Sequence, residues 1–159
     1  MNLDKIPEDE FKEFVRSKFT KFGKKISPSA IDRIFTESQN VPHYVQLLSF
    51  YLWDHYQDLT EIEEHHVAEA MSLILRGQEP AYLTIWESLT SHQRKATKAA
   101  ATLQGQYLTS KETVQRFNLE SASNVAKSLG ALCSKGILRK EHDRYVFEDV
   151  LLGRWVEKV

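Results

Sequence analysis

The densest group of side chains able to bind a metal or transfer a proton is Glu63-Glu64-His65-His66. Imidazoles and carboxylates are zinc ligands and the commonest general acids and bases of enzymes. Adjacent residues on a helix, however, point about 100° apart, so they seldom bind one ion together. We therefore interpret this cluster as a solvated helix face.

Other sequence signs of catalysis are also missing. The chain has no G-x-x-x-x-G-K-[ST] phosphate loop and no G-x-G-x-x-G motif. Cys133 is the single cysteine, which leaves no second thiolate for a zinc site or an intramolecular disulfide. No serine lies in a strand-to-helix nucleophile elbow. The sequence predicts a protein that is not an enzyme by itself, with no catalytic residue, no metal site and no cofactor of its own.

A second group of polar residues has the spacing expected of a helix that contacts nucleic acid. Val125, Leu129 and Leu132 follow the cap residue Ser121 and form an inward face. The predicted outward residues, all able to hydrogen-bond to phosphates or base edges, are Ser123, Asn124, Lys127 and Ser128. Further phosphate contacts are expected from a following β-hairpin, through Arg139, Lys140 and Arg144. The alternative interpretation is a solvated face on a domain that binds protein.

The elements that would position these residues follow a definite order in residues 80–159. Thr90 and Gln93 form a capping box, and Ser110 and Ser121 each begin a further helix. The pair Tyr107-Leu108 is expected to form a brief strand. Two β-prone runs, residues 137–140 and 144–147, then predict a hairpin, and Asp149 caps a last helix. This order is that of a winged helix-turn-helix domain.

Residues 1–79 predict four helices. Apolar residues at helical spacing in the first helix, all expected to point inward, are Phe11, Phe14, Val15, Phe19 and Phe22. Residues 44–53 are apolar nearly all round, which predicts the buried centre of a bundle. Thr60 and Glu63 are expected to cap the fourth helix, which should end at Arg76-Gly77, with Pro80 at the domain boundary. The expected fold class is mainly α: a four-helix, lid-like bundle followed by a winged helix-turn-helix domain with a small β-hairpin.

Charge and hydropathy limit the possible partners. Residues 1–80 carry 9 Lys/Arg against 14 Asp/Glu, whereas residues 81–159 carry 12 against 8. An acidic half joined to a basic half suggests two modules with different partners. No apolar run is long enough to cross a bilayer, and no signal peptide opens the chain. With a single cysteine as well, we expect a soluble cytoplasmic protein with no membrane partner.

Residues 40–48, NVPHYVQLL, followed by Tyr51-Leu52-Trp53, resemble the lid subdomain of prokaryotic AAA+/STAND-type P-loop ATPases, the archaeal ATPase family. The upstream Leu3-Asp4-Lys5-Ile6-Pro7 resembles that family's opening segment. The family's winged helix is similar to three later stretches, which are Leu89-Thr90-Ser91-x-Gln93, Lys135-Gly136-Ile137-Leu138 and Tyr145-x-Phe147-x-Asp149. The similarity covers almost the whole chain through short motifs in a shared order.

The resemblance implies a 1–79 helical lid subdomain and an 80–159 winged helix-turn-helix domain, both belonging to an ATPase whose P-loop core is absent here. It further implies that Asn40, Pro42 and His43 contact nucleotide in the intact protein. Pro42 would pack against the adenine of ATP or ADP, and Mg would be held elsewhere in that protein. Asn40 replaces the family's usual glycine, a mild change because Asn tolerates left-handed geometry. His43 lies where many AAA+ lids place an arginine sensor.

Three hypotheses follow. In the first, this chain is a non-catalytic regulatory segment: the lid closes over nucleotide bound by the P-loop core, and the winged helix is the output arm. In the second, the winged helix binds double-stranded DNA, within an initiator-like ATPase or as a transcription regulator. In the third, the chain is an adaptor that binds another protein.

Overall fold

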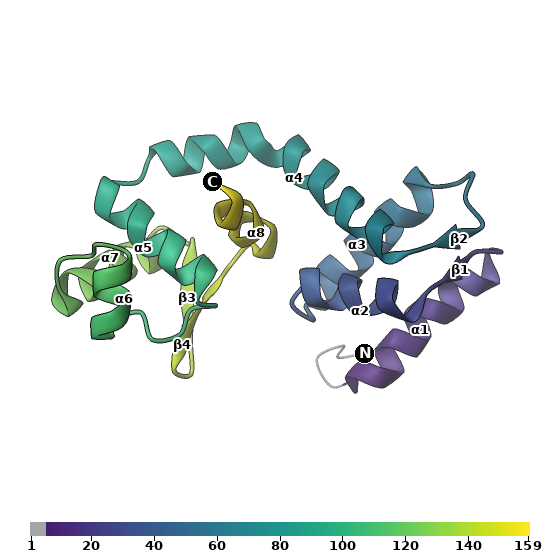
Figure 1. Ribbon diagram of the computed structural model, residues 1–159, viewed down its shortest axis with the longest axis horizontal. Coiled ribbons are helices and arrows are strands. Elements are labelled where there is room, and N and C mark those ends of the chain that lie inside the picture. The colour runs from purple at the N-terminus through teal and green to yellow at the C-terminus, as the bar shows by residue number, and fades with distance from the viewer. Residues whose placement is uncertain (1–5) are drawn as a thin grey trace. The chain divides into compact units, whose positions relative to one another are not determined.

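The computed structural model describes residues 6–159 and divides into two compact units after Gly77 (Figure 1). Of the opening motif, Leu3-Asp4-Lys5 lies outside the described residues. The described part contains eight helices and two two-stranded sheets, so the expected mainly α fold class is confirmed. Within the same residues, no helix is both long enough and apolar enough to span a membrane.

The first unit surrounds a short parallel strand pair with helices. Strands β1 (Lys25–Ile26) and β2 (Glu61–Ile62) pair with Ile26 opposite Ile62. The helices are α1 (Glu8–Lys21), α2 (Pro28–Glu37), α3 (Pro42–His55) and the first part of α4 (Glu64–Glu87). The strands were not predicted, because two residues are too few to reveal an alternating pattern. They nevertheless bring the start of α2 next to the start of α4, as Ser27 N donates to Ile62 O at 3.0 Å.

A buried lysine closes one end of this unit. Gly23 takes a left-handed φ of +80° after α1, and Lys24 N donates to Phe19 O at 3.0 Å, as in a Schellman ending. Lys24 is only 6% exposed. Its Nζ donates to the carbonyl oxygens of Tyr56 and, at 2.9 Å, Leu59, just beyond α3. The buried charge therefore meets the negative end of a helix.

Two expectations about the inward faces are wrong. Phe14 and Phe22 are 53% and 60% exposed, whereas Phe11, Val15 and Phe19 are buried as predicted. Helix α3 is not the buried centre of the bundle either, because Phe50 is 64% exposed. The sequence of α3 is apolar nearly all round, but α2 packs against it and only Val45, Leu48 and Leu52 of α3 are buried.

The start and course of α4 also differ from expectation. Thr60 does not cap it; Thr60 O accepts from Lys25 N in the strand region, and α4 begins at Glu64 with His66 Nδ1 accepting from Glu63 N. The helix does not end at Arg76-Gly77 but continues through Gly77 and Pro80 to Glu87. A proline removes one helical hydrogen bond. Residues 76–81 are all exposed, so water can solvate the carbonyl that is left without a partner.

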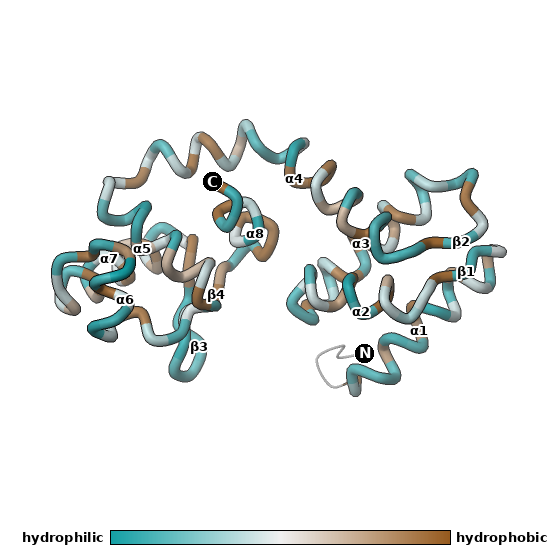
Figure 2. Tube along the Cα trace, in the orientation of Figure 1, coloured by the Kyte–Doolittle hydropathy of each residue, from teal (hydrophilic) through white to brown (hydrophobic). Residues whose placement is uncertain are grey.

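The second unit has the element order predicted for a winged helix. After the end of α4 come three helices, a hairpin and a last helix: α5 (Ser91–Thr102), α6 (Lys111–Arg116), α7 (Ala122–Ser134), β3 (Leu138–Glu141), β4 (Arg144–Phe147) and α8 (Val150–Lys158). The Thr90/Gln93 capping box and the Ser110, Ser121 and Asp149 caps are all confirmed. Figure 2 shows a hydrophilic tip on the hairpin and hydrophobic residues along α8, which packs against α5 and β4.

The hairpin is anchored to the turn after α5. Arg144 pairs with Glu141 and Phe147 with Leu138 in an antiparallel register. Tyr145 N donates to Gly105 O at 3.0 Å. Gly105 has a φ of +76°, and a Cβ there would lie 1.7 Å from Tyr145 O, so only glycine fits. The strand expected at Tyr107-Leu108 is wrong: Tyr107 has a positive φ of 57°, which does not suit a strand.

Candidate functional site

Helix α7 is held in place by an imidazole on α5. Nδ1 of His92 lies 2.6 Å from Ser128 Oγ, and its Nε2 lies 2.9 Å from Leu119 O in the turn before α7. A carbonyl oxygen only accepts, so Nε2 carries the proton that it donates to Leu119. In the neutral imidazole Nδ1 then accepts from the Ser128 hydroxyl. One side chain thereby joins α5, the turn and α7.

Three of the four predicted outward residues of α7 are exposed: Ser123, Asn124 and Lys127. Asn124 Nδ2 donates to Glu120 Oε2 at 3.0 Å, so this amide is already engaged. The prediction that Ser128 points outward is wrong, since Ser128 is 8% exposed and bonded to His92. Its position three residues after Val125 and four before Leu132 was the signal for the inward face.

The three predicted cations of the hairpin differ in their contacts and exposure. Arg139 is held by Glu141 at 2.9 Å and Glu148 at 3.3 Å. The hydrogen bond to Glu141 is the main reason why the pKa of Arg139 is raised. Lys140 Nζ lies 5.8 Å from the centre of the Tyr145 ring, and Arg144 is half-buried. The charge of Arg139 is therefore largely neutralised by two carboxylates of its own domain. Lys127, in contrast, is exposed on α7.

Sequence reasoning overlooked two cations at the ends of α6, the helix that precedes α7. Lys111 and Arg116 are both exposed. The Arg116 guanidinium carbon lies 5.1 Å from the centre of the Phe117 ring. Their signal in the sequence was the pairing of a Ser110 cap with basic residues on either side of a short polar helix. Arg116 lies at the end of α6, next to the turn that leads to α7, whereas Lys111 lies at its start.

The predicted nucleotide-facing residues lie at an exposed corner between α2 and α3. Asn40 has a positive φ of 59°, the left-handed geometry that was expected. Pro42 is the first residue of α3, after Val41, which gives no side-chain hydrogen bond to the helix. Asn40 and His43 are exposed and Pro42 is half-buried. The corner therefore presents a proline ring and an uncapped, partially positive helix end.

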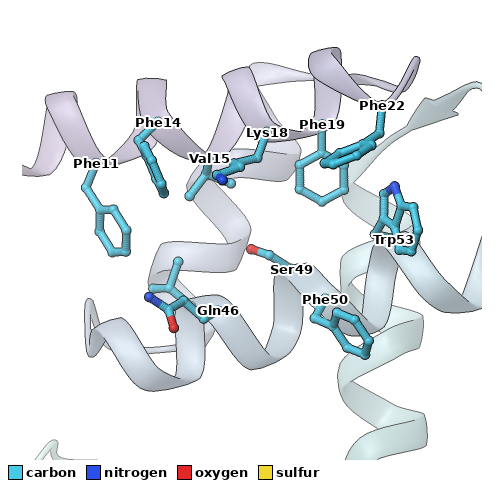
Figure 3. Close-up of a pocket in the computed structure, with 11 residues that line it drawn as sticks. Phe11, Phe14, Val15, Lys18, Phe19, Phe22, Gln46, Ser49, Phe50 and Trp53 are labelled. Carbon is cyan, nitrogen blue, oxygen red and sulfur yellow. The ribbon is translucent and has the colours of Figure 1, made fainter.

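An open apolar groove between α1 and α3 was not predicted. Its volume is about 530 Å³. Figure 3 shows rings from α1 and α3 around it, with the polar side chains of Gln46 and Ser49 on the α3 side. It is lined by Phe11, Phe14, Val15, Lys18, Phe19, Phe22, Val45, Gln46, Ser49, Phe50 and Trp53. The sequence showed apolar residues around nearly all of α3, which could have indicated an unfilled face.

Residues 80–158 match the family model described as a probable winged helix domain. The match spans α5 to α8 and the end of α4, and it agrees with the element order of the second unit. No curated protein matches the chain. The second half of this protein is a winged helix domain.

Proposed function

We propose that this winged helix domain is the output arm of a nucleotide-dependent switch. In this proposal the chain is a non-catalytic regulatory segment of an AAA+/STAND-like ATPase. The first unit is the lid, which closes over ATP or ADP bound with Mg by a P-loop core that the chain itself lacks. Nucleotide would favour one lid orientation over another, and the winged helix would pass that population shift to a partner.

The observation that carries the proposal is the corner formed by Asn40, Pro42 and His43. Left-handed geometry at Asn40 turns the chain sharply, so that the half-buried Pro42 ring begins α3 between exposed Asn40 and His43. A rigid apolar ring at such a corner is suited to packing against the flat face of a base. The uncapped N-terminus of α3 adds a weak preference for a negatively charged neighbour.

The same corner fits a base better than a triphosphate. Residues 38–46 contain no lysine or arginine, so no side chain there can neutralise phosphate charge. His43 is exposed, and its ring lies against Tyr44 at 5.1 Å between centroids. Phosphate and Mg contacts would therefore fall to the P-loop core, and the isolated chain should bind nucleotide weakly or not at all.

The proposal is tested on the native ATPase assembly, in which the chain is joined to or associated with its P-loop core. Mass spectrometry of the protein purified with the chain identifies that core. Fluorescent ATP binding is then compared between the wild type and Pro42→Ala, with Pro28→Ala at the start of α2 as the control. We expect Pro42→Ala to weaken ATP binding several-fold and the control to leave it unchanged. Micromolar ATP binding or hydrolysis by the isolated chain would contradict the proposal.

A second candidate function is supported by the exposed face of α7. Ser123, Asn124 and Lys127 face solvent in the element that winged helices commonly place in the major groove. Lys140 and Arg144 lie on the adjoining hairpin. These residues favour binding to double-stranded DNA as the form that the output takes. The salt dependence of duplex binding distinguishes this output from a protein contact.

A further inference from the structure

We propose that the α1–α3 groove is a docking site for an amphipathic helix of a partner protein that carries acidic residues beside its apolar stripe. This inference goes beyond the nucleotide switch and does not depend on it. It rests on three observations in the first unit: large exposed rings, an unpaired cation among them, and buried polar atoms without partners.

The first observation is the apolar surface itself. Phe14, Phe22 and Phe50 are each more than half exposed, at 53%, 60% and 64%, and together they border the groove. Single exposed apolar residues are common on proteins, but a contiguous set is typical of an interaction site. Two neighbouring helices with rings along both edges suit a third helix, whose anchors recur at i, i+3, i+4 and i+7.

The groove lacks the features of a small-molecule site. Its polar lining residues are Lys18, Gln46 and Ser49, spread over both helices rather than converging on one point. A small ligand usually depends on a few converging polar groups for its orientation. An elongated apolar occupant with polar groups along its side fits this lining better.

The second observation is the charge of Lys18. Two other cations of α1 are paired: Lys12 with Glu8 and Asp32, and Arg16 with Glu13. Lys18 makes no ion pair among residues 6–159 and instead lies 5.3 Å from the centre of the Phe14 ring. It is the one charged residue that lines the groove, and no acidic residue joins it there. The occupant should therefore bring a carboxylate to this position.

The third observation is a pair of polar atoms buried in the groove wall. Ser49 Oγ and Trp53 Nε1 have no hydrogen-bond partner in the described part of the chain. An indole N–H can only donate, so it also requires an acceptor. The Phe22 ring packs edge-on against Trp53, with 5.7 Å between the ring centroids. Figure 3 shows the indole nitrogen on the side that faces Phe22. Because Phe22 is largely exposed, its ring can move and open this donor to an acidic partner.

The test uses the full chain and two designed helical peptides with the same leucine stripe, flanked by glutamates in one and by lysines in the other. Binding is followed by NMR at the indole N–H signals of the three tryptophans, with Trp53 assigned through Trp53→Phe. We expect the Trp53 signal to shift and saturate while the Trp86 and Trp155 signals stay unchanged. The glutamate peptide should bind roughly fivefold more tightly at low salt, as for about one exposed charge pair.

Two pairs of variants make the test specific. Lys18→Glu should reverse the preference between the peptides, whereas Lys25→Glu, at an exposed position on β1, should not. Phe50→Ser should weaken binding of both peptides at least about tenfold, as expected for the loss of an aromatic anchor. Leu83→Ser, at an exposed apolar site on α4 away from the groove, should leave binding unchanged. Unaltered thermal unfolding of each variant shows that the fold is intact.

Three results would overturn the inference. The first is the absence of any Trp53 shift with either peptide. The second is equal affinity for the acidic and the basic peptide, which would remove the role of Lys18. The third is a dimer in sedimentation that Phe50→Ser dissociates, because the occupant would then be a second copy of this chain.

Discussion

Nδ1 of His92 and Oγ of Ser128 lie 2.6 Å apart and join α5 of the winged helix domain to α7. The other ring nitrogen of His92 binds Leu119 O, in the turn that leads into α7. The orientation of the surface that carries Ser123, Asn124 and Lys127 therefore depends on a side chain that does not belong to that surface. A polar residue on α7 thus contributes to the fold rather than to contact with a partner.

Ser128→Ala should lower the free energy of unfolding by about 1 kcal/mol, the usual net value of one hydrogen bond. Ser123→Ala is the matched control on the same helix, and it should change stability by less than about 0.5 kcal/mol because Ser123 is exposed. Denaturant unfolding of the whole chain measures both. Equal effects of the two substitutions would show that the His92–Ser128 contact does not hold α7.

Gly105→Ala should be far more disruptive than Gly136→Ala. Both glycines have positive φ values, +76° and +74°, so each substitution costs about 1–2 kcal/mol in backbone strain. Only at Gly105 would the new Cβ also meet the Tyr145 backbone, 1.7 Å from its oxygen. We expect Gly105→Ala to cost more than about 3 kcal/mol by adding that clash to the strain. Similar losses in guanidinium unfolding for both variants would refute the anchoring of the hairpin at Gly105.

The Cys133 thiol should ionise at a higher pH in the folded chain than in the unfolded chain. Burial is the main cause that raises its pKa above the ordinary 9.0; the Glu148 carboxylate adds to the effect and Lys140 opposes it. The contribution of the protonated Cys133 thiol to folding stability is complete below the unfolded-state pKa. It is lost as pH rises through the higher folded-state pKa. Near pH 9.0, the ordinary pKa of the group, the folded chain should react with a disulfide reagent more slowly than the unfolded chain.

The control for this experiment is Glu148→Gln, which should lower the thiol pKa only in part because burial is the larger cause. The rate of thiol modification is measured against pH for the folded protein, for the variant and for the protein in denaturant. A folded-state profile that coincides with the unfolded one would contradict the pKa shift.

If the output of the switch is DNA binding, duplex affinity should fall steeply with salt. Each cation that contacts a phosphate adds about one to the slope of log K against log salt, so Lys127→Ala and Arg144→Ala should each reduce the slope by about one. Lys158→Ala, beyond the hairpin on α8, is the control and should leave the slope unchanged. Failure of any duplex to bind at low salt would leave a protein as the target of the winged helix.

Features encoded by a few neighbouring residues could be predicted from the sequence. The Thr90/Gln93 capping box, the Ser121 cap and the Asp149 cap each depend on contacts within a single turn of helix. The hairpin followed from two β-prone runs joined by a short polar turn. The positions of Asn40 and Pro42 at the start of α3 were likewise evident from residue type alone.

Features that depend on distant contacts could not be predicted in this way. The β1–β2 pair joins residues 25–26 to residues 61–62, and nothing local signals it. Whether Phe50 is buried depends on which helices cover α3, a property that an evenly apolar helix does not reveal. Pro80 lies within α4 rather than after a helix end, since a single lost hydrogen bond is tolerated where the surrounding residues are exposed.

The proposed lid function depends most on the role of Pro42, and one comparison of ATP affinity tests that role directly. The assembly of this chain with its P-loop core is titrated with fluorescent ATP as the wild type and as Pro42→Ala, beside the isolated chain. We predict several-fold weaker binding for the variant assembly and no saturable binding below millimolar ATP for the isolated chain. Equal ATP affinity of the two assemblies, or micromolar binding by the chain alone, would contradict a lid that acts on nucleotide held elsewhere.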